Sequence, residues 1–271
     1  MSKIILTDSN LFFYLYAFLG NPQLLIITPK TVIDSLANDG VQNSVGFAVH
    51  DGIAYVASFS QIEQEFNEIM GGVAKITVFK YDVKNPSLPS KEEITLPAVF
   101  ISQDGRAPTG QMIYHEGFLY LLLSSFTVSP SVNQNIEKVY SCGALVKINP
   151  STLAIDTSFG DNGYLGLVSG RTISGTYNND SYSMKLYSPT ESDESRAFYG
   201  PVGFVAVMPK KLVIADAGYA LSKGSNNELR ARRKNRVVTV DLETQAFDVA
   251  SLSDTTFYGN ITSGCGFLVV E

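Results

Sequence analysis

The chain has 271 residues, of which 45% are hydrophobic and 17% charged, with 20 Lys and Arg against 26 Asp and Glu. This composition is typical of a globular protein with a hydrophobic core, and it excludes a disordered or fibrous chain. The net charge of −6 argues against a nucleic-acid-binding protein, because phosphate binding needs a basic surface field.

No membrane span and no secretory signal are expected in this chain. The apolar run 11–19 is shorter than the roughly 18 residues of a spanning helix, and Pro22 follows it. Only Lys3 precedes the first apolar residues, and no Ala-x-Ala cleavage site follows them. The sequence by itself assigns no cellular compartment.

A hairpin-like segment recurs four times along the chain. Each copy consists of two β-prone runs around a polar turn, and Asp51-Gly52 is a strong hairpin signal because such a turn needs positive φ. The four copies are Lys3–Phe18, which is the most degenerate, and then Ser44–Phe59, Thr109–Ser124 and Gly200–Tyr219.

A third β-prone element follows every hairpin, at 23–34, 75–86, 144–156 and 236–248. The segments Asn149–Ser151 and Asp241–Thr244 then read as turns into a fourth, less regular strand. The unit is therefore about four antiparallel strands.

Two segments depart from this unit. The polar stretch Ser169–Ala197 separates the third and fourth copies and predicts either a long excursion or an extra hairpin around Tyr182–Tyr187. We expect it to be more mobile than the strands. In Gln61–Met70, apolar residues at 62, 66 and 69 share a helical face and predict one short helix.

Repeated four-stranded units predict an all-β fold, namely a β-propeller of about four blades, closed or an open arc of a larger propeller. A β-sandwich is the alternative fold. The whole chain, 1–271, is then a single propeller domain or a partial one. Its approximate blades are 3–43, 44–106, 107–198 and 199–260, with the start of a further strand at 264–271.

The ends of the chain leave ring closure open. The strand Gly266–Val270 either pairs beside Ile4–Leu6 and closes a four-bladed ring, or begins another blade of an open arc. We expect the arc, because the segment reads as a first strand. An arc exposes the apolar faces of its end blades, which would favour self-association, and the chain would then be an incomplete piece of a longer protein.

Two segments carry a resemblance to known repeats. The run from Leu145 to Gly163 is similar in style to short propeller repeats of bacterial surface and envelope proteins. Phe198–Pro201 followed by Val213–Asp216 resembles the opening of an NHL-like blade. This resemblance implies a scaffold role, and an envelope or secreted setting for a full-length parent protein.

Few residues suggest chemistry. His50 and His115 lie 65 positions apart at the same place in successive repeats, which predicts packing at hairpin ends and not metal binding. Asp156, Asp161 and Asn162 offer oxygen ligands, but their spacing predicts a turn and not a calcium loop. Cys142 and Cys265 read as two buried thiols, with a disulfide between them as the alternative.

Seven residues are candidates for interactions. A basic run precedes the strand Val237–Val240, and we expect it in a solvated loop, with contact to an anionic polymer or surface as the other reading. Tyrosines in the insertion offer an aromatic contact surface. The candidates are Arg230, Arg232, Arg233 and Lys234, continued in sequence by Arg236, and Tyr177, Tyr182 and Tyr187.

The sequence leaves three hypotheses for function open. No nucleophile elbow, phosphate loop, dinucleotide fingerprint or paired-cysteine zinc motif is present, so no catalytic residue, cofactor or metal is expected. The first hypothesis is a non-enzymatic binding or scaffold module that uses its loops to contact a protein or glycan. The alternatives are a hydrolase or lyase with its site at a channel mouth, and a fragment without independent function.

Overall fold

The computed structural model describes strands and turns over most of the chain. The described residues are 3–7, 10–15, 23–27, 43–63, 73–82, 85–95, 109–129, 138–167, 172–177, 180–185, 189–223 and 229–251. Within these ranges the only helical element is a 3-10 turn, Glu191–Asp193. No helix in the described ranges is long and apolar enough to cross a membrane.

Three sheets have four strands each, and in all of them each strand pairs antiparallel with the next strand along the chain. The first contains β4 (Asn43–His50), β5 (Ile53–Glu63), β6 (Val73–Asp82) and β7 (Asn85–Thr95). The second contains β8 (Thr109–His115), β9 (Phe118–Ser129), β10 (Lys138–Ile148) and β11 (Tyr164–Leu165). The third contains β14 (Pro201–Met208), β15 (Lys211–Lys223), β16 (Leu229–Asp241) and β17 (Phe247–Ser251).

Two smaller sheets complete the described strands. The first of them has the order β1 (Lys3–Thr7), β2 (Asn10–Leu15) and β3 (Gln23–Ile27), and the second pairs β12 (Thr172–Tyr177) with β13 (Asp180–Lys185). All four predicted hairpins are therefore confirmed as strand pairs, and the predicted extra hairpin corresponds to β12 and β13. The fold is all-β, as predicted.

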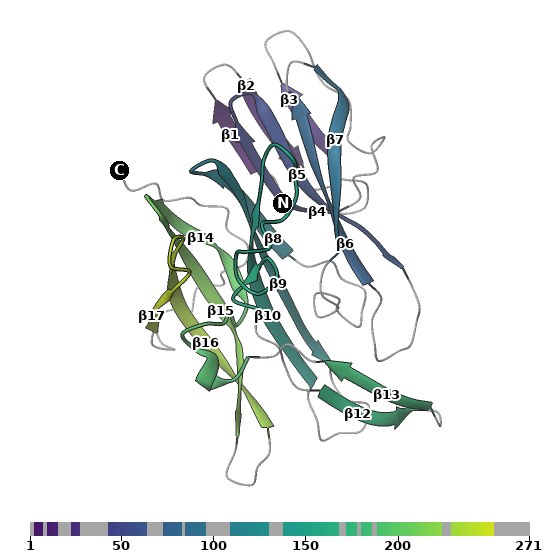
Figure 1. The fold of residues 1–271 in the computed structure, drawn as a ribbon, viewed down its shortest axis with the longest axis vertical. Helices are drawn as coiled ribbons and strands as arrows, with labels where there is room; N and C mark the ends of the chain where they lie inside the picture. Colours follow the sequence, from purple (N-terminus) through teal and green to yellow (C-terminus); the bar gives the residue numbers. More distant parts are fainter. Residues whose placement is uncertain are drawn as a thin grey trace.

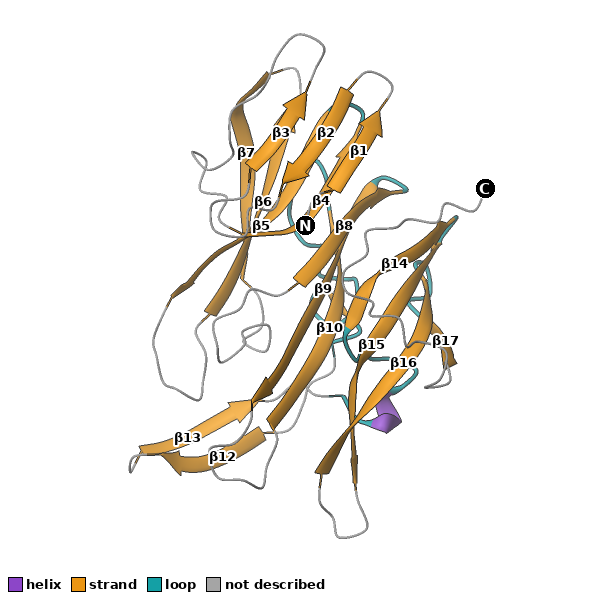
Figure 2. Cartoon of the chain, turned by 180° about the vertical axis from the view of Figure 1, so that it is seen from behind, coloured by secondary structure: helices purple, strands orange, loops and turns teal. Residues whose placement is uncertain are grey.

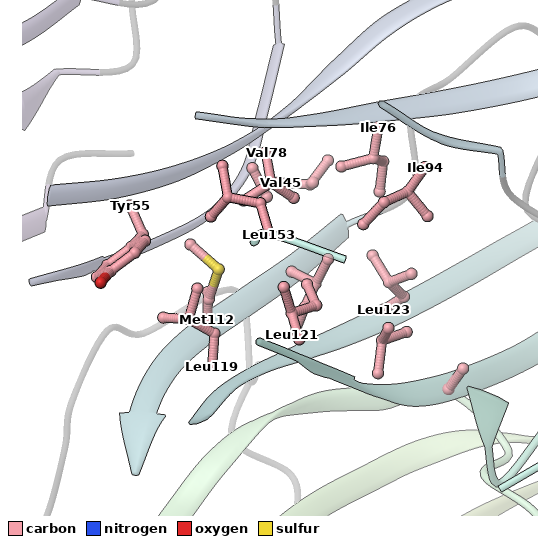
Figure 3. Packing of buried hydrophobic residues seen from close by; sticks show 14 of the residues in the cluster. Val45, Tyr55, Ile76, Val78, Ile94, Met112, Leu119, Leu121, Leu123 and Leu153 are labelled. Atoms are coloured by element: carbon pink, nitrogen blue, oxygen red, sulfur yellow. The ribbon is translucent and has the colours of Figure 1, made fainter. Parts of the chain in front are cut away.

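The three four-stranded sheets stack in chain order, with β8–β11 in the middle (Figure 1). Leu119, Leu121 and Leu123 of β9 belong to a core shared with β4–β7, whereas Tyr120 and Leu122 belong to a core shared with β14–β17. Successive residues of a strand point to opposite faces, so this unbroken apolar run serves both cores. Figure 3 shows the first core, in which Met112 and Leu121 lie beneath Val45 and Val78.

Glycine lets the first strands of neighbouring sheets come close. A Cβ on Gly110 of β8 would lie 2.5 Å from the carbonyl oxygen of Val45 on β4. A Cβ on Gly46 of β4 would in turn lie 2.8 Å from the Cβ of Met112. Neither site has room for a larger residue, so these two glycines set the spacing between the first two sheets.

The last sheet is buried mainly on one face. Leu212 and Ile214 of β15 are completely buried against the middle sheet, while Val213 and Ala215, which alternate with them, are partly exposed. The alternation is the pattern expected of a strand with a single core-facing side. This sheet therefore depends on one inter-sheet contact.

Several predictions need correction. The predicted helix Gln61–Met70 is wrong at 61–63, which continue β5, and its remainder lies outside the described residues. The polar stretch Ser169–Ala197 contains the hairpin of β12 and β13, and it ends at Ala197, which is fully buried beside Phe198. A propeller is the finer reading and is not established: the described strands form separate sheets and no closed barrel.

Ring closure depends on residues outside the described part of the chain. The strand expected at Gly266–Val270 falls there, as does any pairing of it with Ile4–Leu6. Cys265 also lies outside, whereas Cys142 is buried within β10.

Candidate functional site

Three hairpin turns lie together at one end of the stack of sheets. The turns are Asp51–Gly52 between β4 and β5, Glu116–Gly117 between β8 and β9, and Pro209–Lys210 between β14 and β15. The first two have positive φ at both residues, 47° and 74° and then 45° and 85°. This is the geometry of a two-residue hairpin turn that matches the twist of the flanking strands. We call the three turns, with Leu242–Glu243 beside them, the turn rim.

Direct contacts join consecutive turns of the rim. The His50 ring at the end of β4 stacks on the Tyr114 ring near the end of β8, with centroids 3.6 Å apart. The backbone N–H of Lys210 donates to Oε1 of Glu116 at 3.1 Å. The rim is thus ordered by contacts between sheets as well as within them.

The turn that leads from β16 into β17 extends the rim. The N–H of Leu242 donates to the carbonyl oxygen of Lys210 at 2.8 Å, and Lys210 Nζ lies 2.8 Å from Oε1 of Glu243. The hydrogen bond to Glu243 raises the pKa of Lys210, so this amine stays charged. Val207 and Met208, the last residues of β14, are 38% and 39% exposed beside these charges.

The two histidines occupy equivalent places at hairpin ends, as predicted. His50 pairs with Ile53 and His115 with Phe118 across their turns. The Nε2 atom of His115 is buried, 3.8 Å from Oε2 of Glu116 and without a hydrogen-bond partner. Within the described residues, no three His, Cys, Asp or Glu side chains gather as metal ligands.

The loop after β10 is a turn, as expected for Asp156, Asp161 and Asn162. Asp156 accepts hydrogen bonds from the Oγ–H and N–H of Ser158 at 2.5 and 3.1 Å, and pairs with Lys147 at 3.0 Å. The hydrogen bonds from Ser158 and Lys147 lower the pKa of Asp156. The carboxylate serves to close the loop.

Two further turns match each other bond for bond. Oδ1 of Asn149 accepts the N–H groups of Ser151 and Thr152, and Oδ1 of Asp241 accepts those of Glu243 and Thr244. In both turns the backbone N–H four residues later donates to the carbonyl of the first residue, at 2.7 and 2.8 Å. Both predicted turns are therefore confirmed, with the same side-chain mechanism.

The basic run lies in a strand, which corrects the expectation of a solvated loop. Arg230, Arg232, Arg233 and Lys234 all fall in β16, each paired with a residue of β15. Lys234 Nζ lies 2.8 Å from Oε1 of Glu191.

Arg236, the last member of that run, is buried in an ion pair. Its Nε donates to Oδ2 of Asp216 at 2.8 Å, and the two side chains are 1% and 0% exposed. Oδ1 of Asp216 also accepts the N–H groups of Tyr199 and Gly200 at 3.1 and 2.7 Å. Burial raises the pKa of Asp216, while Arg236 and these N–H donors oppose the rise.

The remaining donors of Arg236 bind the segment before β14. Nη1 donates to the carbonyl of Glu194 at 2.6 Å, Nη2 donates to the carbonyl of Ala197, and the Tyr199 ring covers the guanidinium at 3.7 Å. Every polar group of the pair therefore has a partner, so we assign it a structural role. It clamps residues 194–200 to the third sheet.

A second carboxylate organises the same segment. Asp193 accepts hydrogen bonds at 2.9 Å from the N–H and the hydroxyl of Thr190, and from Nε of Arg196. Burial alone would raise the pKa of Asp193, but the hydrogen bonds from Thr190 and Arg196 outweigh it and lower the pKa. The Tyr199 hydroxyl adds a bond to the carbonyl of Thr190 at 3.1 Å.

The structure brings only part of the predicted interaction set together. Tyr177 of β12 pairs with Asp180 and Tyr182 of β13 pairs with Gly175, so the two tyrosines are two residues away from direct pairing, and Tyr187 lies outside the described residues. The basic residues lie on a different sheet. The contacts between Glu116 and Lys210 and between Asp216 and Arg236 carried no local sequence signal, because their partners are 94 and 20 positions apart.

Comparison with known proteins gives a match for part of the chain. A family model described as the TdpA C-terminal domain matches residues 173–263, about a third of the chain. The matched range contains β12 through β17 and therefore both partners of the Asp216–Arg236 pair. No curated protein sequence matches the chain.

Seven chains of solved structures match. One of them is MPT-4, a mannose phosphorylase from Leishmania mexicana in complex with phosphate ion, with 8% identity and a TM-score of 0.39. The match covers 92% of this chain and 66% of that chain, just under two thirds of its length. The family match is to the TdpA C-terminal domain and not to an NHL-like repeat.

Proposed function

We propose that this chain is a non-enzymatic binding or scaffold module, built as an open arc of propeller-like blades, that contacts a protein or glycan through its turn rim. The observation that carries the proposal is the alignment of consecutive turns by the His50–Tyr114 stack and the Lys210–Glu116 hydrogen bond. Turns held in this way form a preorganised surface, which lowers the entropic cost of binding.

Three features support the blade-like arrangement. The four-stranded sheets share one strand order, and the first strand of the middle sheet, β8, adjoins both β4 and β14. Glycines at 46 and 110 permit that approach. The matching turns at Asn149 and Asp241 occupy the same place in successive sheets. In a propeller, neighbouring blades bury each other's faces in this manner, and an NHL-like unit is one version of it.

The chemistry of the rim suits a mixed polar and apolar partner surface. Asp51, Glu116, Lys210 and Glu243 have side chains 44–86% exposed, and Met208 adds an exposed apolar contact among them. Interfaces of moderate affinity combine an apolar centre with a polar surround. The rim has both.

A photo-crosslinking amino acid at Met208 tests the proposal in the full chain, expressed in the cells that naturally produce it. The matched control carries the same group at Ala250, which is exposed on β17 four residues beyond the end of the turn at Ala246. We expect one defined protein or glycan adduct from position 208 and none from position 250. The same adducts from both positions, or none from position 208, would refute the rim as the binding surface.

A further inference from the structure

The end of the β15–β16 hairpin extends beyond its sheet as a two-stranded ribbon. The two strands pair from Lys211 and Asp241 to Lys223 and Leu229. However, β17 pairs with β16 only at 236–240, and β14 pairs with β15 only at 211–216. Among the described strands, residues 217–223 and 229–235 therefore pair only with each other, and their base contacts the segment before β14, where the N–H of Ala217 donates to the carbonyl of Gly200 at 3.1 Å. We call these two segments the basic ribbon; Figures 1 and 2 show it projecting from the third sheet.

The basic ribbon concentrates positive charge in an acidic protein. Its fourteen residues include five Lys and Arg and no Asp or Glu; the five are Lys223, Arg230, Arg232, Arg233 and Lys234. The rest of the chain has fifteen Lys and Arg against 26 Asp and Glu. The ribbon is thus opposite in sign to the remainder of the chain.

The backbone spaces these charges regularly. Arg230 and Arg232 pair with Ser222 and Ala220, and because strand residues rise about 3.3 Å each, their backbone positions are about 6.6 Å apart. Arg233 pairs with Tyr219 in the same register. An extended polymer with anionic groups along its length can follow such a row. Arginine in particular binds carboxylate or sulfate groups through two parallel N–H donors.

We propose that the basic ribbon binds a linear acidic polysaccharide. A DNA duplex carries one negative charge per about 1.7 Å and is wider than the ribbon, so it would bring further phosphates within a Debye length, about 8 Å, of the acidic remainder of the protein. A single polysaccharide chain contacts the ribbon alone. This surface is independent of the turn rim, so either proposal can fail without the other.

The test measures binding of a fluorescent heparin oligosaccharide and of polygalacturonate to the full chain by anisotropy, over a range of salt concentrations. The ribbon variant is Arg230→Ser with Arg232→Ser, which spares Lys234 and Arg236 with their contacts to Glu191 and Asp216. The control, Lys91→Ser with Lys211→Ser, removes the same charge from exposed positions outside the ribbon. A third variant, Arg230→Lys with Arg232→Lys, keeps the charge.

We expect the wild type and the control to bind at least one of the two polysaccharides with equal affinity. The ribbon variant should bind about tenfold or more weakly, with a salt slope smaller by about two. The lysine variant should retain most of the binding, which separates loss of charge from loss of folding. The proposal is overturned if the wild type binds neither polysaccharide, if ribbon and control variants weaken equally, or if duplex DNA binds more tightly than both.

Discussion

Arg236 and Asp216 face each other inside the third sheet, with Nη2 of the arginine 2.7 Å from Oδ2 of the aspartate and both side chains excluded from solvent. Their twenty-residue separation is spanned by the β15–β16 hairpin, so the ion pair forms only when the register of that hairpin is correct. The same two side chains hold the backbone of residues 194–200. One pair therefore joins three segments of the chain.

Removing one partner of this pair should be strongly destabilising. Asp216→Asn and Arg236→Met each leave a buried group without its opposite charge, and we expect each to lower the free energy of unfolding by about 3–5 kcal/mol. Urea denaturation followed by circular dichroism measures this loss. The exposed control Lys210→Gln, which loses only the ion pair with Glu243, should unfold at the wild-type midpoint. A loss below about 1 kcal/mol for both buried variants would contradict the clamp.

Two substitutions of Tyr199 should separate the contribution of its hydroxyl from that of its ring to the stability of the Asp216–Arg236 cluster. Tyr199→Phe keeps the ring over Arg236 and loses the hydroxyl bond to Thr190, at an expected cost of about 1 kcal/mol. Tyr199→Leu also removes the ring from the buried guanidinium and should cost about 2 kcal/mol more. Equal midpoints for the two variants in thermal melts would mean that the ring over Arg236 contributes nothing.

The lowered pKa of Asp193 should make the free energy of unfolding depend on pH in acid. Its pKa is lower in the folded chain than in the unfolded chain, so the unfolded chain binds more protons as the pH falls below about 4. The stabilisation is complete above the unfolded pKa and is lost as the pH falls through the folded pKa. Asp193→Asn should unfold about 1–3 kcal/mol more easily at pH 7 and show a shallower decline in acid. Denaturant titrations at several pH values measure both. An unchanged acid profile in the variant would show that Asp193 does not contribute.

Two glycines on one hairpin should respond differently to the same substitution. At Gly110 a Cβ would collide with the carbonyl oxygens of Val45 and Leu122, so Gly110→Ala should cost about 3 kcal/mol or more by forcing β4 and β8 apart. At Gly117 the backbone has φ of +85° but open space, so Gly117→Ala should cost only about 1 kcal/mol. The ratio of the two losses, from denaturation midpoints, tests whether the sheets meet closely at Gly110. If Gly117→Ala were the worse variant, the close approach would be wrong.

Local patterns predicted the strands well because they report local physics. Asp51-Gly52 identified a hairpin through its need for positive φ, and Asn149 and Asp241 identified turns through their side-chain acceptors. The same reasoning failed for Arg236. In a run of cations it reads as solvated, and only the distant Asp216 on the neighbouring strand makes its burial favourable.

Long-range packing explains the other differences. The polar composition of the stretch before β14 gives no sign of burial, yet Asp193 and Thr190 satisfy each other's polar groups there, which permits Ala197 and Phe198 to be buried. The turn rim could not be assembled from sequence, because its defining contact joins Glu116 to a residue 94 positions away. The equivalence of His50 and His115 was the one local hint of a common end.

Because the middle sheet is buried on both faces, we expect the last sheet to detach before the middle sheet unfolds. Releasing β14–β17 requires opening one interface, whereas releasing β8–β11 requires opening two, because alternate residues of β9 are committed to opposite cores. Amide hydrogens of β9 should therefore exchange with solvent only in near-global unfolding, and those of β14–β17 should exchange earlier and as a group. A species with the last sheet detached would present the apolar face of Tyr120 and Leu122 to other molecules. That transient species, and not the native stack, is then the state from which the protein would begin to aggregate.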